Sequence, residues 1–491
     1  MNNNIVRNFL KTVEKNEHFN ILKYKKNNKW KNINRGKLLN KINNCIYVLN
    51  DQNVKKGDRV AYKGKNSVEW LSWNMAALSL GATWVPMYEQ QTLQQCQYIV
   101  NNCQPKVLIT NEKIDIINTN IIDNKINDLK FYDFNSIDVK SNKLSTLIYT
   151  SGTTGNPKGV MLSHENILSN IEAIRMRFKD IQPKLTSLNI LPWAHIYGLT
   201  CELYYNLFFD NKTALCSDKL KFIDECKEIK PEVLYVVPKV LETVKSKTQF
   251  LDKPLVRTAL PFVVNKVFGG NLLNMFIGGA KLDKNTREYF EKSNVLLCEG
   301  YGCSETSPMV SVNHLYNPKN PESIGKIMDN IDVKIINGEI CVSGPNVMKG
   351  YWMDDEETNN VFLLHENKVW YKTGDSGEIK DGFLFFNGRI SENYKMNNGK
   401  FVNVASVEAK LKRYINTNFI IYGENMDYSV LIVEEPFDEQ LLDTVNSELE
   451  SYMKIKKVIK ITTDEMTNFL TPKMSIKRKK LIEFVKNSNT V

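Results

Sequence analysis

The most informative stretch of this chain is Tyr149-Thr150-Ser151-Gly152-Thr153-Thr154-Gly155-Asn156-Pro157-Lys158-Gly159. It joins an apolar, strand-like run at 147–149 to a segment of glycines and hydroxyl residues that carries one lysine. Glycines let backbone N–H groups approach an anion closely. Hydroxyl side chains add hydrogen-bond donors, and the lysine adds a mobile positive charge. We therefore predict that residues 151–159 form a loop that holds the phosphates of a nucleotide.

This pattern differs from the common P-loop, in which the lysine is followed by a Ser or Thr that binds magnesium. Here Pro157 precedes the lysine and Gly159 follows it. A Gly- and Thr-rich surface turn is the alternative reading. The run resembles the phosphate-binding signature of the adenylate-forming enzymes, which include acyl-CoA synthetases, luciferases and the adenylation domains of peptide synthetases. The resemblance implies a magnesium contact from Thr154 and ATP contacts from Thr150, Ser151, Gly152, Thr153, Thr154, Gly155 and Lys158.

Length and composition limit the number of domains and the classes of protein that remain possible. The 491 residues are too many for one ordinary core, and 42% hydrophobic with 10% aromatic residues is typical of a globular chain. The net charge is +10, but lysine and asparagine are scattered along the whole sequence. Because no basic stripe is interleaved with aromatic residues, we expect no nucleic-acid binding. The charge is compatible with mild attraction to polyphosphate ligands or anionic lipid surfaces.

Cysteine usage and hydropathy indicate the compartment. The nine cysteines form no C-x-x-C pair, and the N-terminus has no apolar core for secretion, so we expect reduced thiols in the cytoplasm. The five histidines show no metal-ligand spacing. No run reaches the ~18–20 apolar residues of a membrane span. Peripheral membrane contact stays open, as does the oligomeric state.

Alternation of strand-like and helix-like stretches over the first ~140 residues predicts a parallel sheet wrapped by helices. One example is a helix from Ser67, its cap, to Leu80, followed by a strand over 83–87. Residues 111–143 are polar and predict a surface excursion. Short strands after Gly325 predict a β-rich part, and the last hundred residues mix helix and strand. With the resemblance, the prediction is a multi-subdomain α/β fold. Residues 1–389 form a large adenylate-forming domain of two layered α/β subdomains plus a β-rich one, and residues 390–491 a small mobile α+β domain.

Two later segments bear on the acyl substrate. The run 191–198 resembles the family segment whose histidine or aromatic residue lines the acyl pocket, which implies a site role for His195. A structural histidine is the alternative. The continuation through Leu203, together with 86–89, looks most like the long-chain fatty acyl-CoA synthetases.

Two further segments resemble the adenine-binding part of the family. A Gly-Gly-Ala turn at 278–280 lets the backbone approach a flat ring. In the run 301–305, Tyr301 can stack on adenine, and Glu305 can hold the magnesium ion that accompanies ATP. The alternative is that these two residues have structural roles only, Tyr301 as a buried side chain and Glu305 as a cap. The implied nucleotide contacts are Gly278, Gly279, Ala280, Tyr301, Gly302 and Ser304.

Asp375 and Arg389 complete the implied nucleoside site. Asp375 follows a tight turn, where its carboxylate can accept two hydrogen bonds from a ribose diol. Arg389 can give a bidentate, charge-assisted contact to ribose or phosphate oxygens. In the family this arginine precedes the hinge between the two domains.

The sequence departs from the family pattern at two positions. Ser391 stands at the hinge, where Lys or Asp is usual, and a gapless match puts Ser475 in place of the catalytic lysine. Lysine acts as a point charge on a long stem. Along a strand, residues 473, 475 and 477 share one face, so either Lys473 or Lys477 can take over this role.

These features predict a fatty acid–CoA ligase that forms acyl-AMP from ATP and then acyl-CoA, with release of pyrophosphate and AMP. The implied partners are a fatty acid, ATP, Mg²⁺ and coenzyme A as co-substrate. The implied catalytic residues are Lys158, His195, Glu305, and Lys473 or Lys477. The alternatives are a ligase that loads a carrier protein and a non-catalytic homologue that binds acyl or nucleotide groups. The acyl chain length stays open.

Overall fold

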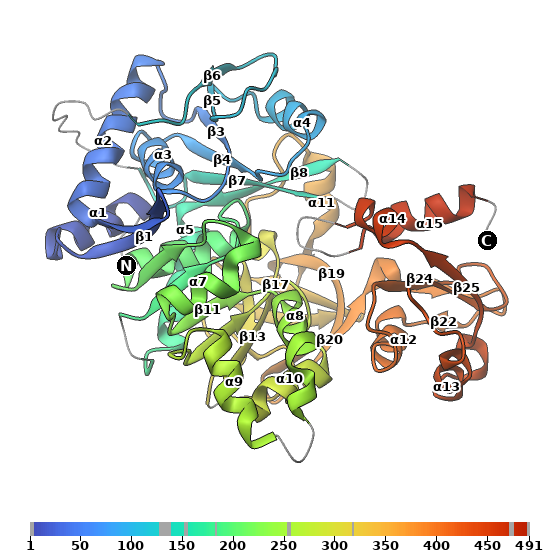
Figure 1. Cartoon of the computed structure of the whole chain (residues 1–491). Helices are drawn as coiled ribbons and strands as arrows, with labels where there is room; N and C mark the ends of the chain where they lie inside the picture. Colours follow the sequence, from blue (N-terminus) through green and yellow to red (C-terminus); the bar gives the residue numbers. More distant parts are fainter. Residues whose placement is uncertain are drawn as a thin grey trace.

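The computed structural model describes residues 4–126, 139–151, 156–181, 184–252, 257–316, 319–470 and 476–488. Figure 1 shows a large body, coloured blue to yellow, with the red C-terminal part beside it. Two large sheets and two small ones, of two and three strands, organise the described part of the chain.

The first sheet has six strands in the order β6-β5-β3-β4-β7-β8. All neighbours are parallel except the β7–β8 hairpin. Its strands are β3 (Arg59–Lys63), β4 (Thr83–Met87), β5 (Val107–Ile109), β6 (Asn120–Ile122), β7 (Leu144–Ser151) and β8 (Pro157–Ser163). The helices of this part are α1 (Ile5–Lys15), α2 (Arg35–Asp51), α3 (Val68–Ser79), α4 (Leu93–Cys103) and α5 (His164–Arg177).

Side-chain alternation along these strands places apolar residues on both faces. Val60 and Trp84 pack with α1, α2 and α3 on one face, and Ala61 and Val85 pack with α4 on the other. Side-chain caps set the helix starts, since Ser67 accepts a hydrogen bond from the backbone N–H of Trp70 at the start of α3. The predicted helix and strand at 67–87 are therefore confirmed.

The second sheet continues through 14 strands. Its α/β part contains β1 (Asn20–Lys26), β2 (Lys29–Asn34), β9 (Thr186–Asn189), β10 (Lys212–Leu215), β11 (Val233–Val236), β12 (Asn274–Ile277) and β13 (Leu296–Gly302). The helices are α6 (Tyr205–Phe208), α7 (Phe222–Ile229), α8 (Pro238–Thr248), α9 (Leu260–Val267) and α10 (Lys284–Lys292). Leu234 and Met275 pack against α7 to α10, whereas Tyr235 and Cys298 face α5 and a π-helix, Tyr197–Tyr204.

The β-rich part is antiparallel and continues directly from β13, so it shares this sheet with the second α/β part. Its elements are β14 (Met309–Val312), β15 (Lys326–Ile327), β16 (Asp332–Ile336), β17 (Glu339–Ser343), α11 (Asp355–Val361), β18 (Phe362–His365), β19 (Lys368–Lys380) and β20 (Phe383–Arg389). The strands predicted at 332–336 and 339–343 are confirmed with the same bounds.

The residues after 389 build their own sheets. The three-stranded sheet β23-β24-β25 packs against α12 and α13 on one face and against α14 and α15 on the other. The elements are β21 (Tyr394–Lys395), β22 (Phe401–Val402), α12 (Val404–Leu411), β23 (Phe419–Tyr422), β24 (Ser429–Glu434), α13 (Leu441–Ser447), β25 (Ile455–Ile461), α14 (Thr463–Asn468) and α15 (Arg478–Asn487). The predicted α/β fold class is confirmed.

One sequence prediction needs correction. The described ends of the segment predicted as a loop at 151–159 are strands, because β7 runs to Ser151 and β8 starts at Pro157, with Thr150 paired to Lys158. Lys158 therefore lies on a strand, where the neighbouring backbone restricts its direction. Residues 152–155 lie outside the described part of the chain. The polar excursion at 111–143 includes β6, which adds a parallel strand to β5.

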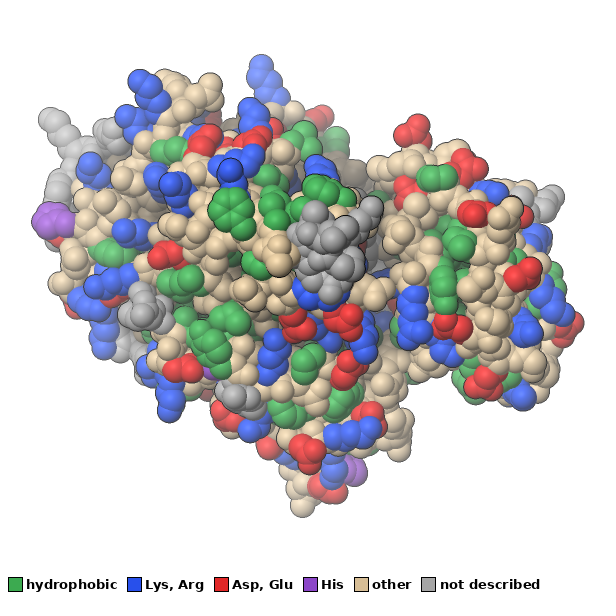
Figure 2. All heavy atoms as spheres, turned by 60° about the horizontal axis from the view of Figure 1, so that its bottom comes forward, with side chains coloured by type: hydrophobic (Ala, Val, Ile, Leu, Met, Phe, Trp, Pro, Cys, Tyr) green, Lys and Arg blue, Asp and Glu red, His purple; other side chains and the backbone are tan. Residues whose placement is uncertain are grey.

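The surface is mixed in charge. Figure 2 shows Lys and Arg side chains interspersed with Asp and Glu across one face. Within the described ranges, no helix combines the length and apolar character needed to cross a membrane.

Candidate active site

A cavity of about 1020 Å³ lies where the carboxyl ends of β12 and β13 meet the β7–β8 hairpin, α5 and the π-helix. The carboxyl ends of parallel strands are a usual place for ligands in α/β sheets. Many of the residues predicted from sequence line it: Thr150, Lys158, His195, Gly278, Gly279, Tyr301, Gly302, Ser304, Glu305 and Arg389. The hinge residue Ser391 also lines it.

The remaining predicted residues fall into two groups. Ala280, Asp375 and Lys477 are described but do not line the cavity: Ala280 is exposed, Asp375 lies behind Tyr301 and Arg389, and Lys477 precedes α15 in the small domain. The side chain of Ser151 and residues Gly152, Thr153, Thr154, Gly155, Lys473 and Ser475 lie outside the described part of the chain.

Tyr301, Asp375 and Arg389 form one cluster. Tyr301 Oη donates to Asp375 Oδ2 at 2.6 Å, and Arg389 Nε lies 2.8 Å from Asp375 Oδ1. Asp375 and Arg389 face each other across β19 and β20, which explains their proximity. Burial raises the pKa of Asp375, and the Arg389 charge and the Tyr301 hydrogen bond oppose this increase. The three side chains therefore form a hydrogen-bonded polar cluster beside the Tyr301 ring.

Two glycines are required by close approach. A Cβ on Gly278 would meet the Tyr197 ring at 3.1 Å, and one on Gly302 would lie 1.6 Å from the carbonyl oxygen of Pro308. A Cβ at 302 would overlap a backbone atom and one at 278 would crowd the Tyr197 ring, so the backbone at these two positions forms a thin wall of the cavity. A flat ring can approach such a wall closely.

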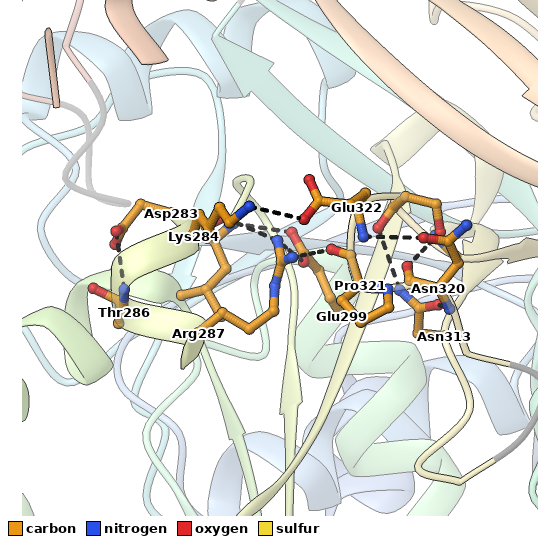
Figure 3. A network of polar contacts seen from close by, with 12 residues as sticks. Asp283, Lys284, Thr286, Arg287, Glu299, Asn313, Asn320, Pro321 and Glu322 are labelled. Atoms are coloured by element: carbon orange, nitrogen blue, oxygen red, sulfur yellow. Dashed lines mark hydrogen bonds and ion pairs between the residues drawn. The ribbon is translucent and has the colours of Figure 1, made fainter. Parts of the chain in front are cut away.

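A polar network joins the segment after Gly279 to β13 (Figure 3). Glu299, on β13 two residues before Tyr301, accepts a hydrogen bond from the backbone N–H of Leu282 at 2.9 Å. Arg287 lies 3.5 Å from the same carboxylate and also donates to the carbonyl of Pro321. Breaking a buried pair of this kind leaves an uncompensated charge. The network therefore fixes the segment after Gly279 relative to the strand that carries Tyr301.

At the polar end of the cavity, Lys158 pairs with a glutamate of α11. Its Nζ forms an ion pair with Glu357 Oε1 and lies 5.4 Å from the centre of the Tyr351 ring. Tyr351 Oη in turn donates to Glu305 Oε1 at 2.9 Å. The side chains of Lys158 and Glu357 are 13% and 29% exposed, so the pair is only partly screened by water.

Backbone pairing explains how this group assembles. The N–H of Trp352 donates to the carbonyl of Gly159, and the N–H of Met161 to that of Gly350. The chain at 349–352 thereby runs along β8 like an added strand, with Val160 opposite Tyr351. The following helix, α11, begins at Asp355, whose preceding residue Asp354 caps the backbone N–H of Glu357. Lys158 and Glu357 are 199 positions apart in sequence but meet here.

The other end of the cavity is an apolar arm. It runs between the α5–π-helix side and the inner face of the second sheet. Lining residues recur along the π-helix and α6 at Tyr197, Cys201, Tyr205 and Phe209, a stripe about 15–18 Å long at a helical rise of 1.5 Å per residue. The opposite wall is formed by Val233, Tyr235, Phe276 and Cys298. Ring contacts of 5.2 Å (Phe178–Phe276) and 5.4 Å (Tyr235–Phe276) make this wall rigid.

His195 marks the junction of the two ends. Its Nδ1 accepts a hydrogen bond from the backbone N–H of Tyr197 at 3.2 Å. In the neutral imidazole, the ring proton is therefore on Nε2.

A carboxyl group is buried behind the arm, at Glu202 of the π-helix. Glu202 has no exposed surface, and its Oε2 accepts from Asn189 Nδ2 at 2.6 Å. Burial raises the pKa of Glu202 to about 8, despite hydrogen bonds from Asn189 and Ser187. The group is thus protonated at neutral pH.

Sequence reasoning missed Tyr351 and Glu357. Glu357 ends an acidic run that starts at Asp354, which is typical of an exposed helix start. Only the pairing of β8 with 349–352 distinguishes it from its exposed neighbour Glu356. No local signal could have identified it.

The donor set fits a magnesium ion that arrives with ATP. Such an ion takes one or two protein carboxylates in addition to phosphate oxygens, and Glu305 places one carboxylate at the cavity surface near Lys158. Within the described ranges, no group of three or more His, Cys, Asp or Glu side chains could hold a metal ion by itself.

Comparisons with known proteins identify the family of this chain. A family model described as "AMP-binding enzyme" matches residues 9–352. The long-chain-fatty-acid–CoA ligase FadD15 of Mycobacterium bovis is 24% identical, over 92% of this chain and 91% of its own length.

Solved structures share the fold. ATP-bound MatB from Rhodopseudomonas palustris is 23% identical with a TM-score of 0.83, covering 99% of both chains. The o-succinylbenzoate coenzyme A synthetase MenE of Bacillus subtilis, in complex with AMP, is 20% identical with a TM-score of 0.80, covering 96% of this chain and 97% of its own. At these identities the similarity establishes the fold.

Proposed function

Because this chain belongs to the family of AMP-binding enzymes, we propose that it is a long-chain fatty acid–CoA ligase. It would activate the carboxylate with ATP to acyl-AMP and pyrophosphate, and then transfer the acyl group to coenzyme A. The observation that carries the proposal is one cavity with two ends. One end is polar, with Lys158, Glu305 and Arg389 in its lining and Asp375 behind Arg389 and Tyr301, and the other is mainly aromatic and aliphatic.

In the first step, the carboxylate oxygen attacks the α-phosphorus of ATP, and the bond to pyrophosphate breaks. Charge on the phosphates must be neutralised, and preorganised positive groups are worth several kcal/mol in such a step. Lys158 supplies one such charge, and Glu305 would hold the magnesium ion. Tyr301 and Asp375 would position the adenosine, and Arg389 its ribose or phosphate oxygens.

The apolar arm supports a long acyl chain as the substrate. Its length of about 15–18 Å along the π-helix and α6 suits an extended aliphatic chain. Each buried methylene contributes about 0.8 kcal/mol, so affinity for the acid should rise about fourfold per carbon until the arm is filled. His195 lines the same cavity, and we propose that it contacts the acyl carboxylate.

In the second step, we propose that residues 390–491 rotate as a lid about Ser391, and that the thiol of coenzyme A attacks the acyl carbonyl and releases AMP. Lys473 or Lys477 would stand in for the lysine expected at Ser475.

The test is release of pyrophosphate and formation of acyl-CoA with acids from short to very long chain. Wild type and the Lys158→Met, Lys473→Ala and Lys477→Ala variants would be compared. Turnover that peaks with long-chain acids and collapses in Lys158→Met is the expected result. ATP binding without pyrophosphate release for every acid would instead point to a non-catalytic homologue.

A further inference from the structure

The ion pair between Lys158 and Glu357 has a consequence for nucleotide binding. Both side chains line the cavity, and the pair lies beside Tyr351 and Glu305. If Lys158 binds the phosphates, as the proposed function holds, an incoming triphosphate must take this ammonium away from a carboxylate that already holds it.

We propose that Glu357 is a positioning residue that competes with phosphate for Lys158 and thereby weakens the binding of ATP and pyrophosphate. The carboxylate holds the ammonium at the cavity wall in the nucleotide-free enzyme. When polyphosphate arrives, the lysine exchanges one anion for another, and Glu357 is left as a negative charge near the phosphates. This opposes retention of pyrophosphate after the first step.

The surroundings favour exchange over a permanent pair. Apart from the ion pair, Glu357 is held within the described ranges through its backbone N–H, which the Asp354 side chain caps, whereas the backbone of Lys158 is fixed between two strands. Glu357 is also the more exposed partner, at 29% against 13%. It can therefore turn towards water while the ammonium stays in the cavity.

The net strength of a partly exposed ion pair sets the size of the effect, because desolvation and side-chain entropy offset most of the Coulomb attraction. A carboxylate that competes for the lysine should thus raise the dissociation constants of ATP and pyrophosphate about fivefold. AMP lacks the β- and γ-phosphates, so its affinity should not depend on Glu357.

The experiment measures the dissociation constants of ATP, pyrophosphate and AMP by calorimetry for wild type and the Glu357→Gln, Glu357→Asp and Glu356→Gln variants. Glu357→Gln should tighten ATP and pyrophosphate about fivefold and leave AMP unchanged. Glu357→Asp keeps the charge on α11 but shortens its reach, so it should fall in between. Glu356→Gln removes the same charge from the exposed side of the helix and serves as the matched control.

Three results overturn the inference. They are unchanged affinities in Glu357→Gln, weaker binding of ATP in that variant, or an equal shift in AMP affinity. The thermal midpoint of each variant, which should match wild type, excludes loss of the fold as the cause. Wild type that fails to bind ATP at all would instead refute the proposed function, so the two failures can be told apart.

Discussion

The buried carboxyl group of Glu202 should make the stability of this enzyme depend on pH in a predictable way. Its ordinary pKa is 4.5, and burial raises the pKa to about 8 in the folded chain. Between these two values the unfolded chain has lost its proton while the folded chain keeps it. The free energy of unfolding therefore falls as pH rises from about 5 to 8. The gap between 4.5 and about 8, at about 1.36 kcal/mol per pH unit, sets an upper limit of about 5 kcal/mol.

The Glu202→Gln variant should remove this dependence. Glutamine stays neutral at every pH, has nearly the shape of the protonated acid, and its amide oxygen can accept the hydrogen bond from Asn189. We expect wild type to be most stable relative to the variant at pH 5. Between pH 5 and pH 8 to 9 the difference in the free energy of unfolding should shift by several kcal/mol in favour of the variant.

Urea unfolding between pH 5 and 9, followed by tryptophan fluorescence, measures this difference. Trp70, Trp84 and Trp193 are buried in the same core and report on it. All other titrating groups contribute equally to both proteins and cancel. Glu288→Gln, an exposed change on α10, is the matched control and should follow wild type. Parallel pH curves for wild type and Glu202→Gln would refute the reasoning.

Three further predictions concern the cavity. Gly302→Ala should abolish AMP binding or soluble expression, because the new Cβ would overlap the carbonyl of Pro308; Gly36→Ala, whose Cβ meets only ordinary contacts, should behave as wild type in the same binding titration. Asp375→Asn should weaken AMP binding about tenfold or more by calorimetry, since charge-assisted hydrogen bonds contribute about 1.5–3 kcal/mol; unchanged affinity would remove this residue from the site. Cys201→Phe should fill part of the arm and move the kcat/KM optimum to shorter acids, by about fourfold per excluded methylene; an unchanged chain-length profile would contradict the assigned arm.

Much of the fold could be predicted from local patterns. The helix after Ser67, the strand at 83–87 and the strands at 332–336 and 339–343 follow from side-chain periodicity and capping, which act over a few residues. The family was also predicted correctly from sequence, because the segments that resemble the family motifs occur along this chain in the same order as in the family.

The loop predicted at 151–159 shows the limit of such reasoning. Composition alone favoured a loop, but the pairing of Thr150 with Lys158 shows that the two described ends of this segment are strands. Turn-forming residue types do not reveal cross-strand hydrogen bonds. Whether Lys473 or Lys477 replaces the lysine expected at Ser475 also stays a prediction.

Local sequence predicts which residue types could meet a nucleotide and in which order they occur. The pairing of Lys158 with Glu357, the place of Asp375 behind Tyr301 and the ring contacts along the arm come from tertiary packing. The cause is distance along the chain. Contacts between residues 199 or 74 positions apart depend on the packing of whole strands and helices, and no local propensity encodes that packing.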